Sequence, residues 1–192
     1  MSEAGTQQNA SDGAPAVAGR SFVERFVGAF RLDGSVYEEV ASDPGALAQA
    51  AGVVACAAAA RVVGVLSATT SGAAVLGALS VFAFWPIATL LVWTVGNLMK
   101  SPGDFGRVLR VVGFAMAPLV LVALNLVPNQ LFDSAILLIT CALLFAALVV
   151  GVRQALRIDS GRAAFVCIVA VMMLFLIYGM VAYATSGTGG TS

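Results

Sequence analysis

Residues 73–98 read AAVLGALSVFAFWPIATLLVWTVGNL and contain no charged side chain. About 20 mainly apolar residues in an α-helix are enough to cross ~30 Å of hydrocarbon. This stretch lies inside a longer region, residues 44–99, in which Arg61 is the only charged side chain. Because the core of a soluble domain does not hold so much uncharged sequence, the chain is predicted to be an integral membrane protein.

The composition of the whole chain agrees with this prediction. Of its 192 residues, 60% are hydrophobic and 10% are charged, whereas soluble domains are about 45–50% apolar and about a quarter charged. The same length criterion selects four more segments, which predicts an all-α, polytopic membrane domain over residues 46–185. The five predicted transmembrane helices are residues 46–67, 73–98, 108–127, 132–152 and 163–184.

The basic residues predict how this domain is oriented. Nine of the ten lie in three polar stretches: Arg20, Arg25 and Arg31; Lys100, Arg107 and Arg110; Arg153, Arg157 and Arg162. Basic loops stay on the cytoplasmic side of a bilayer. With five spans, all three stretches fall on one side, while the turns at 68–72 and 128–131 fall on the other. The pattern therefore predicts a plasma-membrane protein with its N-terminus in the cytoplasm and its C-terminus outside.

Residues 20–45 are predicted to form a cytosolic amphipathic leader, between a disordered tail (1–19) and the membrane domain. A second disordered tail is expected at 186–192, since both tails are rich in small and polar residues. One helical face of the leader is apolar and is made by Phe22, Val23, Phe26, Val27 and Phe30, with Glu24, Arg25 and Arg31 off that face. Such a helix either lies in the headgroup plane or packs on the cytoplasmic ends of the bundle.

A second short helix is expected after Gly34. Ser35 and Glu38 have the spacing of a capping box, in which the serine accepts from a backbone amide and the glutamate reaches back. This helix should end near Ser42, because Pro44 disfavours helical backbone at the residue before it. Residues 43–45, Asp-Pro-Gly, would then connect it to the first span.

The side chains that most enzymes use are missing from the apolar segments. The chain has no histidine, and its ten carboxylates all lie outside the predicted apolar cores. The three cysteines fall within apolar stretches, where they are expected to pack rather than to form disulfides or bind metal. No cofactor and no enzymatic activity are expected. Zero net charge without a basic stripe makes nucleic acid an unfavourable partner.

Three polar side chains inside or near the spans are candidate functional residues: Arg61, Asn97 and Asn125. Arg61 either extends to the outer interface, pairing there with Asp133, or faces a cavity within the bundle. The first span also carries small residues four apart, including Gly52 and Gly64, which would allow another helix to approach closely. Packing within the chain is favoured over packing against a second copy.

Two prolines are expected to kink the helices that contain them. Pro86 lies in the second segment and Pro118 in the third, and each removes a backbone donor from an apolar helix. Paired broken helices occur in transporters, where they usually belong to an internal repeat. No such repeat is visible between the two halves of this chain.

Several strings of the sequence, in this order and spacing, resemble the prokaryotic branch of the Yip1 domain family over about residues 32–184. They are YEEVASDPGAL (37–47), GRVLRVVGFAMAP (106–118), VVGVRQALR (149–157) and SGRA (160–163). The resemblance implies five spans behind a cytosolic leader. Eukaryotic members are linked to vesicle traffic, Rab GTPases and membrane shaping, and they assemble with relatives. Their Asp-Leu-x-Gly-Pro motif has only a loose counterpart here at 43–45, so the GTPase link does not carry over directly.

The leading hypothesis for function is a non-enzymatic membrane protein that organises or shapes the bilayer or scaffolds partners. Its partners would be the lipid bilayer and other membrane proteins, in homo- or hetero-oligomers. The candidate cytosolic contact residues are Asp43, Arg107, Arg110 and Arg157. The alternative is a small permease or channel for a solute or lipid, with a water-accessible cavity near Arg61, Asn97 or Asn125.

Overall fold

The computed structural model describes residues 19–65, 71–101, 103–126 and 129–187, which are almost entirely helical. The helices are α1 (Phe22–Phe30), α2 (Gly34–Ser42), α3 (Ala46–Val65), α4 (Ser71–Leu98), α5 (Phe105–Ala115), the 3₁₀ helix η1 (Ala117–Leu126), α6 (Gln130–Leu156) and α7 (Ser160–Gly187). The described residues contain five stretches that are long and apolar enough to cross a membrane: Ala46–Gly64, Ala74–Leu98, Phe105–Asn125, Gln130–Leu156 and Ser160–Ile177. The predicted all-α fold with five spans is confirmed. The predicted tails lie outside the described residues except for Gly19 and the end of α7.

α6 extends beyond its predicted apolar segment, residues 132–152, at both ends. α6 begins at Gln130 because the Asn129 side chain caps it, accepting from the amides of Leu131 (3.1 Å) and Phe132 (3.3 Å). At its other end, α6 continues past the apolar run to Leu156, with Arg153 in the last turn, where a positive charge is favourable. Hydropathy marks only the apolar part of a helix, so it misses these polar turns.

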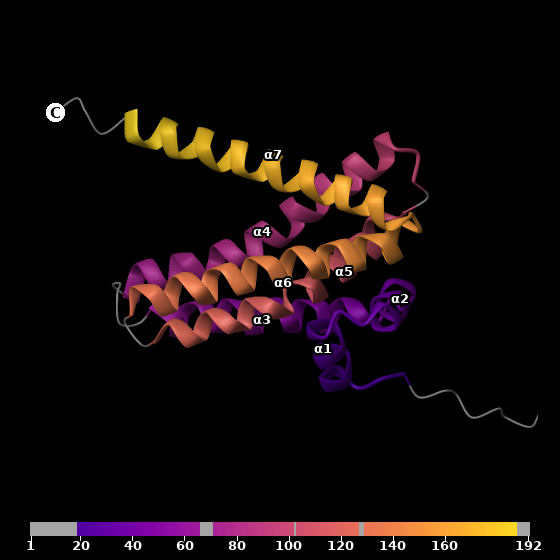
Figure 1. Ribbon diagram of the computed structural model, residues 1–192, viewed down its shortest axis with the longest axis horizontal. Coiled ribbons are helices and arrows are strands. Elements are labelled where there is room, and N and C mark those ends of the chain that lie inside the picture. Colours follow the sequence, from indigo (N-terminus) through magenta and orange to yellow (C-terminus); the bar gives the residue numbers. More distant parts are fainter. Residues whose placement is uncertain (1–18, 66–70, 102, 127–128, 188–192) are drawn as a thin grey trace, which may run out of the picture.

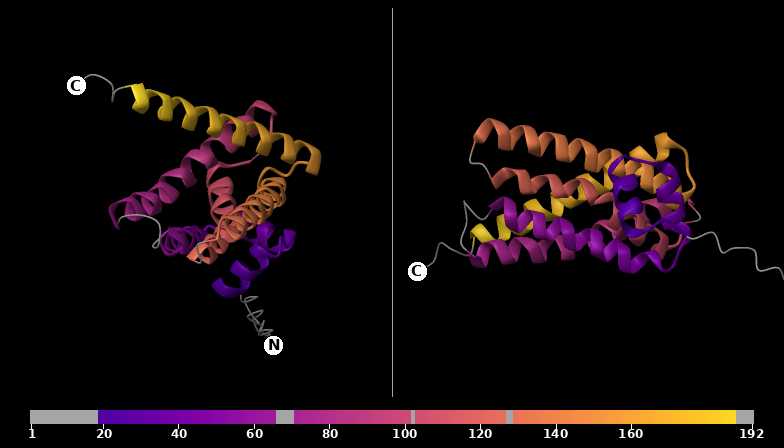
Figure 2. Two further views of the ribbon diagram at one scale, coloured as in Figure 1. Left: turned by 60° about the vertical axis from the view of Figure 1, so that its left-hand side comes forward. Right: turned by 90° about the horizontal axis from the view of Figure 1, so that it is seen from below.

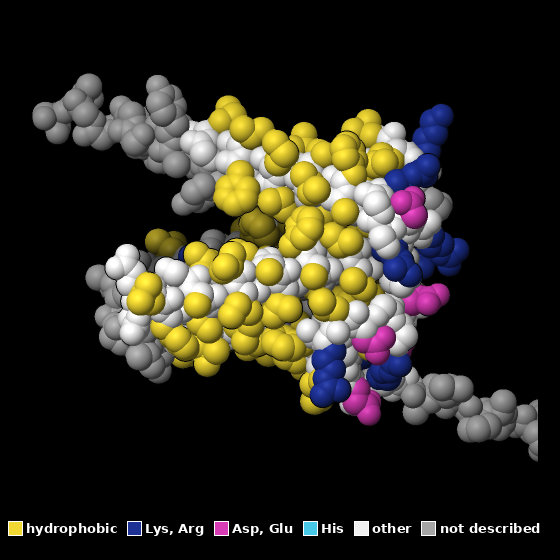
Figure 3. Space-filling view, in the orientation of Figure 1, with side chains coloured by type: hydrophobic (Ala, Val, Ile, Leu, Met, Phe, Trp, Pro, Cys, Tyr) yellow, Lys and Arg dark blue, Asp and Glu magenta, His cyan; other side chains and the backbone are white. Residues whose placement is uncertain are grey.

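The long helices run from one end of the molecule to the other, with α4 and α7 inclined to each other (Figure 1). One end of the bundle carries α1, α2 and the connections 99–104 and 157–159, and we call it the basic end. We call the opposite end the far end. There α3 is followed by α4, η1 is followed by α6, and α7 ends. Lys and Arg side chains gather at the basic end of the face drawn in Figure 3, whereas hydrophobic side chains cover the rest of it.

The third span changes helix type in its middle. α5 ends at Ala115, and Met116 caps it. The Met116 amide donates to the carbonyls of Gly113 and Phe114, and the chain continues as η1. Pro118 has no amide hydrogen to bond the carbonyl four residues earlier, and the tighter helix begins beside it. A kink was predicted at Pro118, and the structure has a change of helix type at this point. In the second span, α4 continues through Pro86 as one α-helix.

Close packing of the bundle depends on two glycines. A Cβ on Gly64 of α3 would collide with the backbone carbonyl of Val122 on η1, so only glycine allows these two segments to lie so close. At Gly113, a Cβ would lie 2.9 Å from the Cβ of Ala50 and 3.1 Å from Trp85 Nε1, where α3, α4 and α5 meet. The close approach predicted for Gly64 occurs within the chain.

The core lies in the half of the bundle nearest the basic end. Val53, Val108 and Val152, from three different spans, are all fully buried there. Toward the far end the helices expose large apolar side chains, such as Leu138 (72% exposed) on α6 and Phe175 (73%) on α7. Figure 2 shows the corresponding arrangement, with α7 diverging from the other helices toward the far end.

Candidate functional site

The basic end is organised around Arg25, whose residue is only 4% exposed. Its guanidinium forms ion pairs with Glu39 Oε1 and Asp43 Oδ2, both at 2.8 Å, and Nη1 donates to Gln49 Oε1 at 2.9 Å. A buried charge needs partners of this kind to offset its loss of hydration. Arg25 thus joins α1, α2 and the start of α3. We call Arg25, Glu39, Asp43 and Gln49 the Arg25 cluster.

Within the Arg25 cluster, the contacts favour the charged forms of Arg25 and Asp43. The hydrogen bond from Arg25 holds the pKa of Asp43 below its usual range, and a second one from the amide of Gly45 (2.9 Å) acts in the same direction. Burial works against the charged form of Arg25, but the hydrogen bonds to Glu39 and Asp43 outweigh it and raise the pKa of Arg25. Asp43, predicted as a cytosolic contact, is thereby engaged within the chain.

Arg110 attaches α5 to the end of α2. Its Nη2 donates to the carbonyl of Ala41 at 2.7 Å and its Nε donates to that of Val40 at 3.2 Å. The last carbonyls of a helix have no partners within the helix, and a cation there is favourable. Of the other predicted contacts, Arg107 is half-buried and its Nε has no partner among the described residues. Arg157 is exposed and ends α6 in the left-handed conformation (φ 52°).

Tyr37 was not singled out from the sequence, yet it is one of the best-packed residues of the basic end. It is fully buried, its hydroxyl donates to the carbonyl of Ala29 at 3.0 Å, and burial raises its pKa. Its ring lies so close to Gly151 of α6 that a Cβ there would be 3.1 Å from the Tyr37 Cδ1. An aromatic residue in a short polar helix gives no sequence signal for such a central position.

The capping box was predicted at the wrong helix. Ser21 and Glu24 form it at the start of α1: the Glu24 amide donates to Ser21 Oγ (3.3 Å) and the Ser21 amide donates to Glu24 Oε2 (2.7 Å). α2 is capped instead by Asp33, which accepts from the Ser35 amide at 2.9 Å. The Ser-x-x-Glu pattern occurs at both places, and Asp33 takes over the capping role at the second one because α2 starts at Gly34.

α1 packs on the bundle, which was one of the two arrangements left open. Phe22, Phe26 and Phe30 pack against the core, and Phe22 lies beside Gly52 of α3. Figure 1 shows α1 set across the bundle and projecting from its side near the basic end. Arg25 was predicted to lie off the apolar face of α1, and the structure adds that α2 and α3 cover the side of α1 that carries it.

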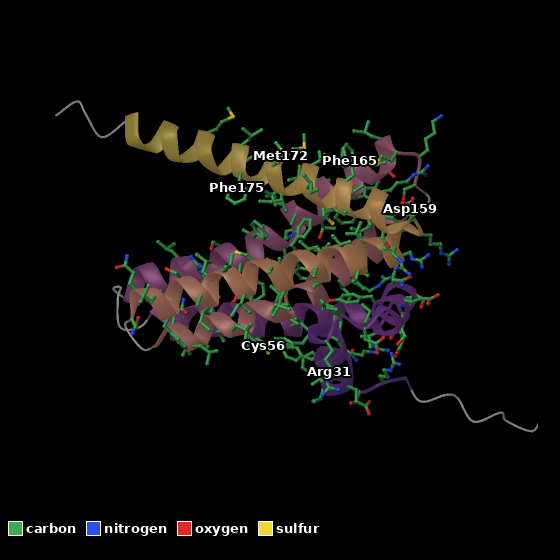
Figure 4. The ribbon with its side chains drawn as sticks, in the orientation of Figure 1. Arg31, Cys56, Asp159, Phe165, Met172 and Phe175 are labelled. Atoms are coloured by element: carbon green, nitrogen blue, oxygen red, sulfur yellow. The ribbon has the colours of Figure 1, made fainter. Side chains whose placement is uncertain are left out.

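The outer side of α1 remains free in this structure. Val23 is 66% exposed and Val27 is 39% exposed. They belong to a groove of about 420 Å³ between α1 and the start of α2, which we call the α1 groove. Its lining consists of Arg20, Val23, Glu24, Val27, Gly28, Arg31, Asp33 and Val36. Figure 4 shows Arg31 on this projecting helix.

The structure separates the polar candidates of the spans. Arg61 is exposed near the far end, and it lies across Gly77 of α4, where a Cβ would be 3.1 Å from its Nε. The expected Arg61–Asp133 ion pair is absent, because the Arg61 side chain packs on α4 instead. Asn125 Oδ1 and Asp133 Oδ1 are buried without a partner in the described part of the chain. Asn97 is exposed at the opposite, basic end.

No described residues form a group of three His, Cys, Asp or Glu side chains that could hold a metal ion. Cys56 and Cys141 are exposed on the helices and Cys167 is buried, all three as free thiols. The polar groups at the basic end instead bind one another and backbone atoms. These contacts attach α1 and α2 to the bundle.

Five spans with a helical cap at one end define a polytopic integral membrane protein of the α-helical bundle class. The model of one family, the Yip1 domain, matches residues 28–183. Since this match covers most of the chain, the chain belongs to the Yip1 domain family. Neither a curated protein nor a solved structure matches it.

Proposed function

We propose that this Yip1 domain protein is a non-enzymatic membrane protein that organises or shapes the bilayer through α1, with partner proteins scaffolded at the same face. The basic end faces the cytoplasm and the C-terminus lies outside the plasma membrane, as the distribution of basic residues favours. The observation that carries this proposal is the position of α1. It is fixed to the side of the bundle by Arg25, while Val23 and Val27 remain exposed.

The chemistry of the outer side of α1 suits a membrane surface. Apolar Val23 and Val27 are flanked by Arg31 and by Arg20, which also pairs with Glu39 at 3.3 Å. Amphipathic helices with apolar residues between basic ones insert shallowly among lipid headgroups. A basic residue near an anionic leaflet adds about 1 kcal/mol of attraction. Insertion on one leaflet only would expand that leaflet and favour curvature.

Reconstitution of the full chain tests this function. Vesicles containing anionic phospholipid should become more curved when the wild-type protein is added, as measured by electron cryomicroscopy. The double variant Val23→Asp, Val27→Asp should lose this effect while keeping its helicity. Glu38→Asp, on the exposed side of α2, is the matched control. Equal curvature with the wild type and the double variant would contradict the proposal.

A second candidate, a small permease or channel, is favoured by the unpartnered polar atoms near the far end. Asn125 Oδ1 and Asp133 Oδ1 are buried in an otherwise apolar region, where such atoms are costly and often mark a solute path. Cysteine substitutions at positions 61, 97 and 125 test it with a water-soluble maleimide. Labelling of Asn125→Cys in the membrane would support a path, and complete protection at all three sites would exclude one.

A further inference from the structure

α7 packs on the bundle only near the basic end. Along its first turns, Ala163, Val166 and Cys167 are at most 1% exposed, and Ala170 is 2% exposed. Beyond Ala170 the helix diverges, and side chains such as Leu176 (65%) become exposed. Figure 3 shows a hollow between α7 and the helices below it, with hydrophobic side chains on its floor.

The base of this hollow is an apolar cavity of about 50 Å³ between α4, α5, η1, α6 and α7, which we call the α7 cleft. The lining includes Phe84 from α4, Met116 beside η1, Leu144 and Leu148 from α6, and Ala170 and Leu174 from α7. Every residue around the cleft is apolar. The volume would admit water, but water needs polar partners that this lining does not offer. The cleft is therefore a site for an apolar group.

We propose that the α7 cleft binds an acyl chain of a membrane phospholipid. The cleft adjoins the lipid-facing surface of the spans, because Phe84 of its lining is itself 42% exposed. The Phe175 side chain points from α7 toward the hollow (Figure 4). An acyl chain is the apolar group that surrounds this surface in a bilayer. It is also thin and flexible enough to enter the narrow base of the cleft.

A helix from a second copy fits the α7 cleft less well. A helix with its side chains is about 10 Å across, and close packing of helices within lipid relies on small residues along the contact. The lining holds Ala88 and Ala170, but the bulkier Leu144, Leu148, Leu174 and Phe84 lie beside them. Such walls leave room for a single chain of methylene groups. This site is independent of the function proposed for α1, which lies on another part of the bundle.

Photocrosslinking of the full chain in nanodiscs tests the proposal. The probe is phosphatidylcholine with a diazirine on its acyl chain, and mass spectrometry maps the labelled residues. Crosslinks are expected on Leu144, Leu148 or Leu174 as well as on fully lipid-exposed positions such as Leu138. The Ala170→Phe variant fills the cleft, so its lining crosslinks should be lost while those at Leu138 persist.

Controls make each outcome informative. Ala142→Phe adds the same bulk on the exposed side of α6 and should leave the cleft crosslinks unchanged. Leu148→Ala widens the cleft and should increase lipid labelling of Leu174. This variant tests the proposal even if Ala170→Phe fails to fold. Wild-type protein without crosslinks in the lining would overturn the proposal. Disulfide-linked dimers of Leu174→Cys in place of lipid labelling would also overturn it, since they would show a second copy in the cleft.

Discussion

Arg25 connects more of the basic end than any other single side chain described here. Its guanidinium contacts acceptors from α2, from the α2–α3 connection and from α3, while its backbone belongs to α1. Asp43 was predicted as a contact for cytosolic partners, whereas the structure shows it paired with Arg25 of the same chain. Its partner could not be predicted, because the periodicity of α1 shows which side is apolar and not which neighbours cover the other sides.

Removal of Arg25 should loosen α1. In Arg25→Met, Glu39 and Asp43 lose their partner, and loss of one member of a buried pair costs ~3–5 kcal/mol. Here the expected loss of stability is about 2 kcal/mol. It is smaller than for a fully buried pair because the side chains of Glu39 and Asp43 are 28% and 38% exposed and solvent screens them. Limited proteolysis within residues 19–45 measures it. Arg31→Met, which changes an exposed arginine on the same helix, should leave the proteolysis rate unchanged.

Acid should release the same contact. Because Asp43 has a lowered pKa in the folded chain, its contribution to stability is complete above the unfolded-state value of about 3.8 and is lost as pH falls through the folded value. The protection of the α1 amides against hydrogen exchange, relative to the intrinsic rate at each pH, should therefore fall below about pH 4. Asp43→Asn should weaken this dependence on pH. An identical pH profile in that variant would assign the effect to other carboxylates.

At the scale of elements, the sequence predicted the spans well and their internal geometry poorly. The length of apolar sequence needed to cross hydrocarbon is a strong constraint, and each predicted segment lies within or overlaps a span. The 3₁₀ form of η1 was not predictable, since Pro118 indicates an interruption without specifying the pitch that follows it. The contact between α3 and η1 was signalled by Gly64, although the sequence did not identify the partner.

The contact at Gly64 predicts an effect on stability. Gly64→Ala places a methyl group against the carbonyl of Val122, and overpacking of this kind costs ~1–3 kcal/mol. Denaturation of the purified protein in detergent, followed by circular dichroism, measures the loss. Gly72→Ala is the matched control, because a Cβ at that position of α4 meets nothing within 4 Å. Equal stability of the two variants would show that α3 and η1 are not held this closely.

At the scale of the whole molecule, the two ends of the bundle differ in charge, as the three basic stretches predicted. The divergence of α7 was not predictable. Its sequence is apolar on all sides, so hydropathy gives no indication of which face packs and which meets lipid. The α7 cleft therefore became visible only in the structure.

The orientation in the membrane can be tested on the two ends directly. In a chain whose native cysteines are replaced by serine, Gln130→Cys at the far end should react with an impermeant maleimide added to intact cells. Asp159→Cys at the basic end should react only after permeabilisation. Both positions are exposed, so differences in burial do not affect the comparison. The reverse pattern would invert the proposed topology.

The central claim is that the bundle holds α1 with its outer side in the headgroup layer. Spin labels on Val23→Cys and Glu38→Cys in the same cysteine-free chain, reconstituted in anionic vesicles, test it by power saturation with oxygen and with a water-soluble nickel chelate. The claim predicts that the label at position 23 is relaxed more by oxygen and the label at position 38 more by nickel. Equal access of nickel to both labels would place α1 in water and contradict the claim.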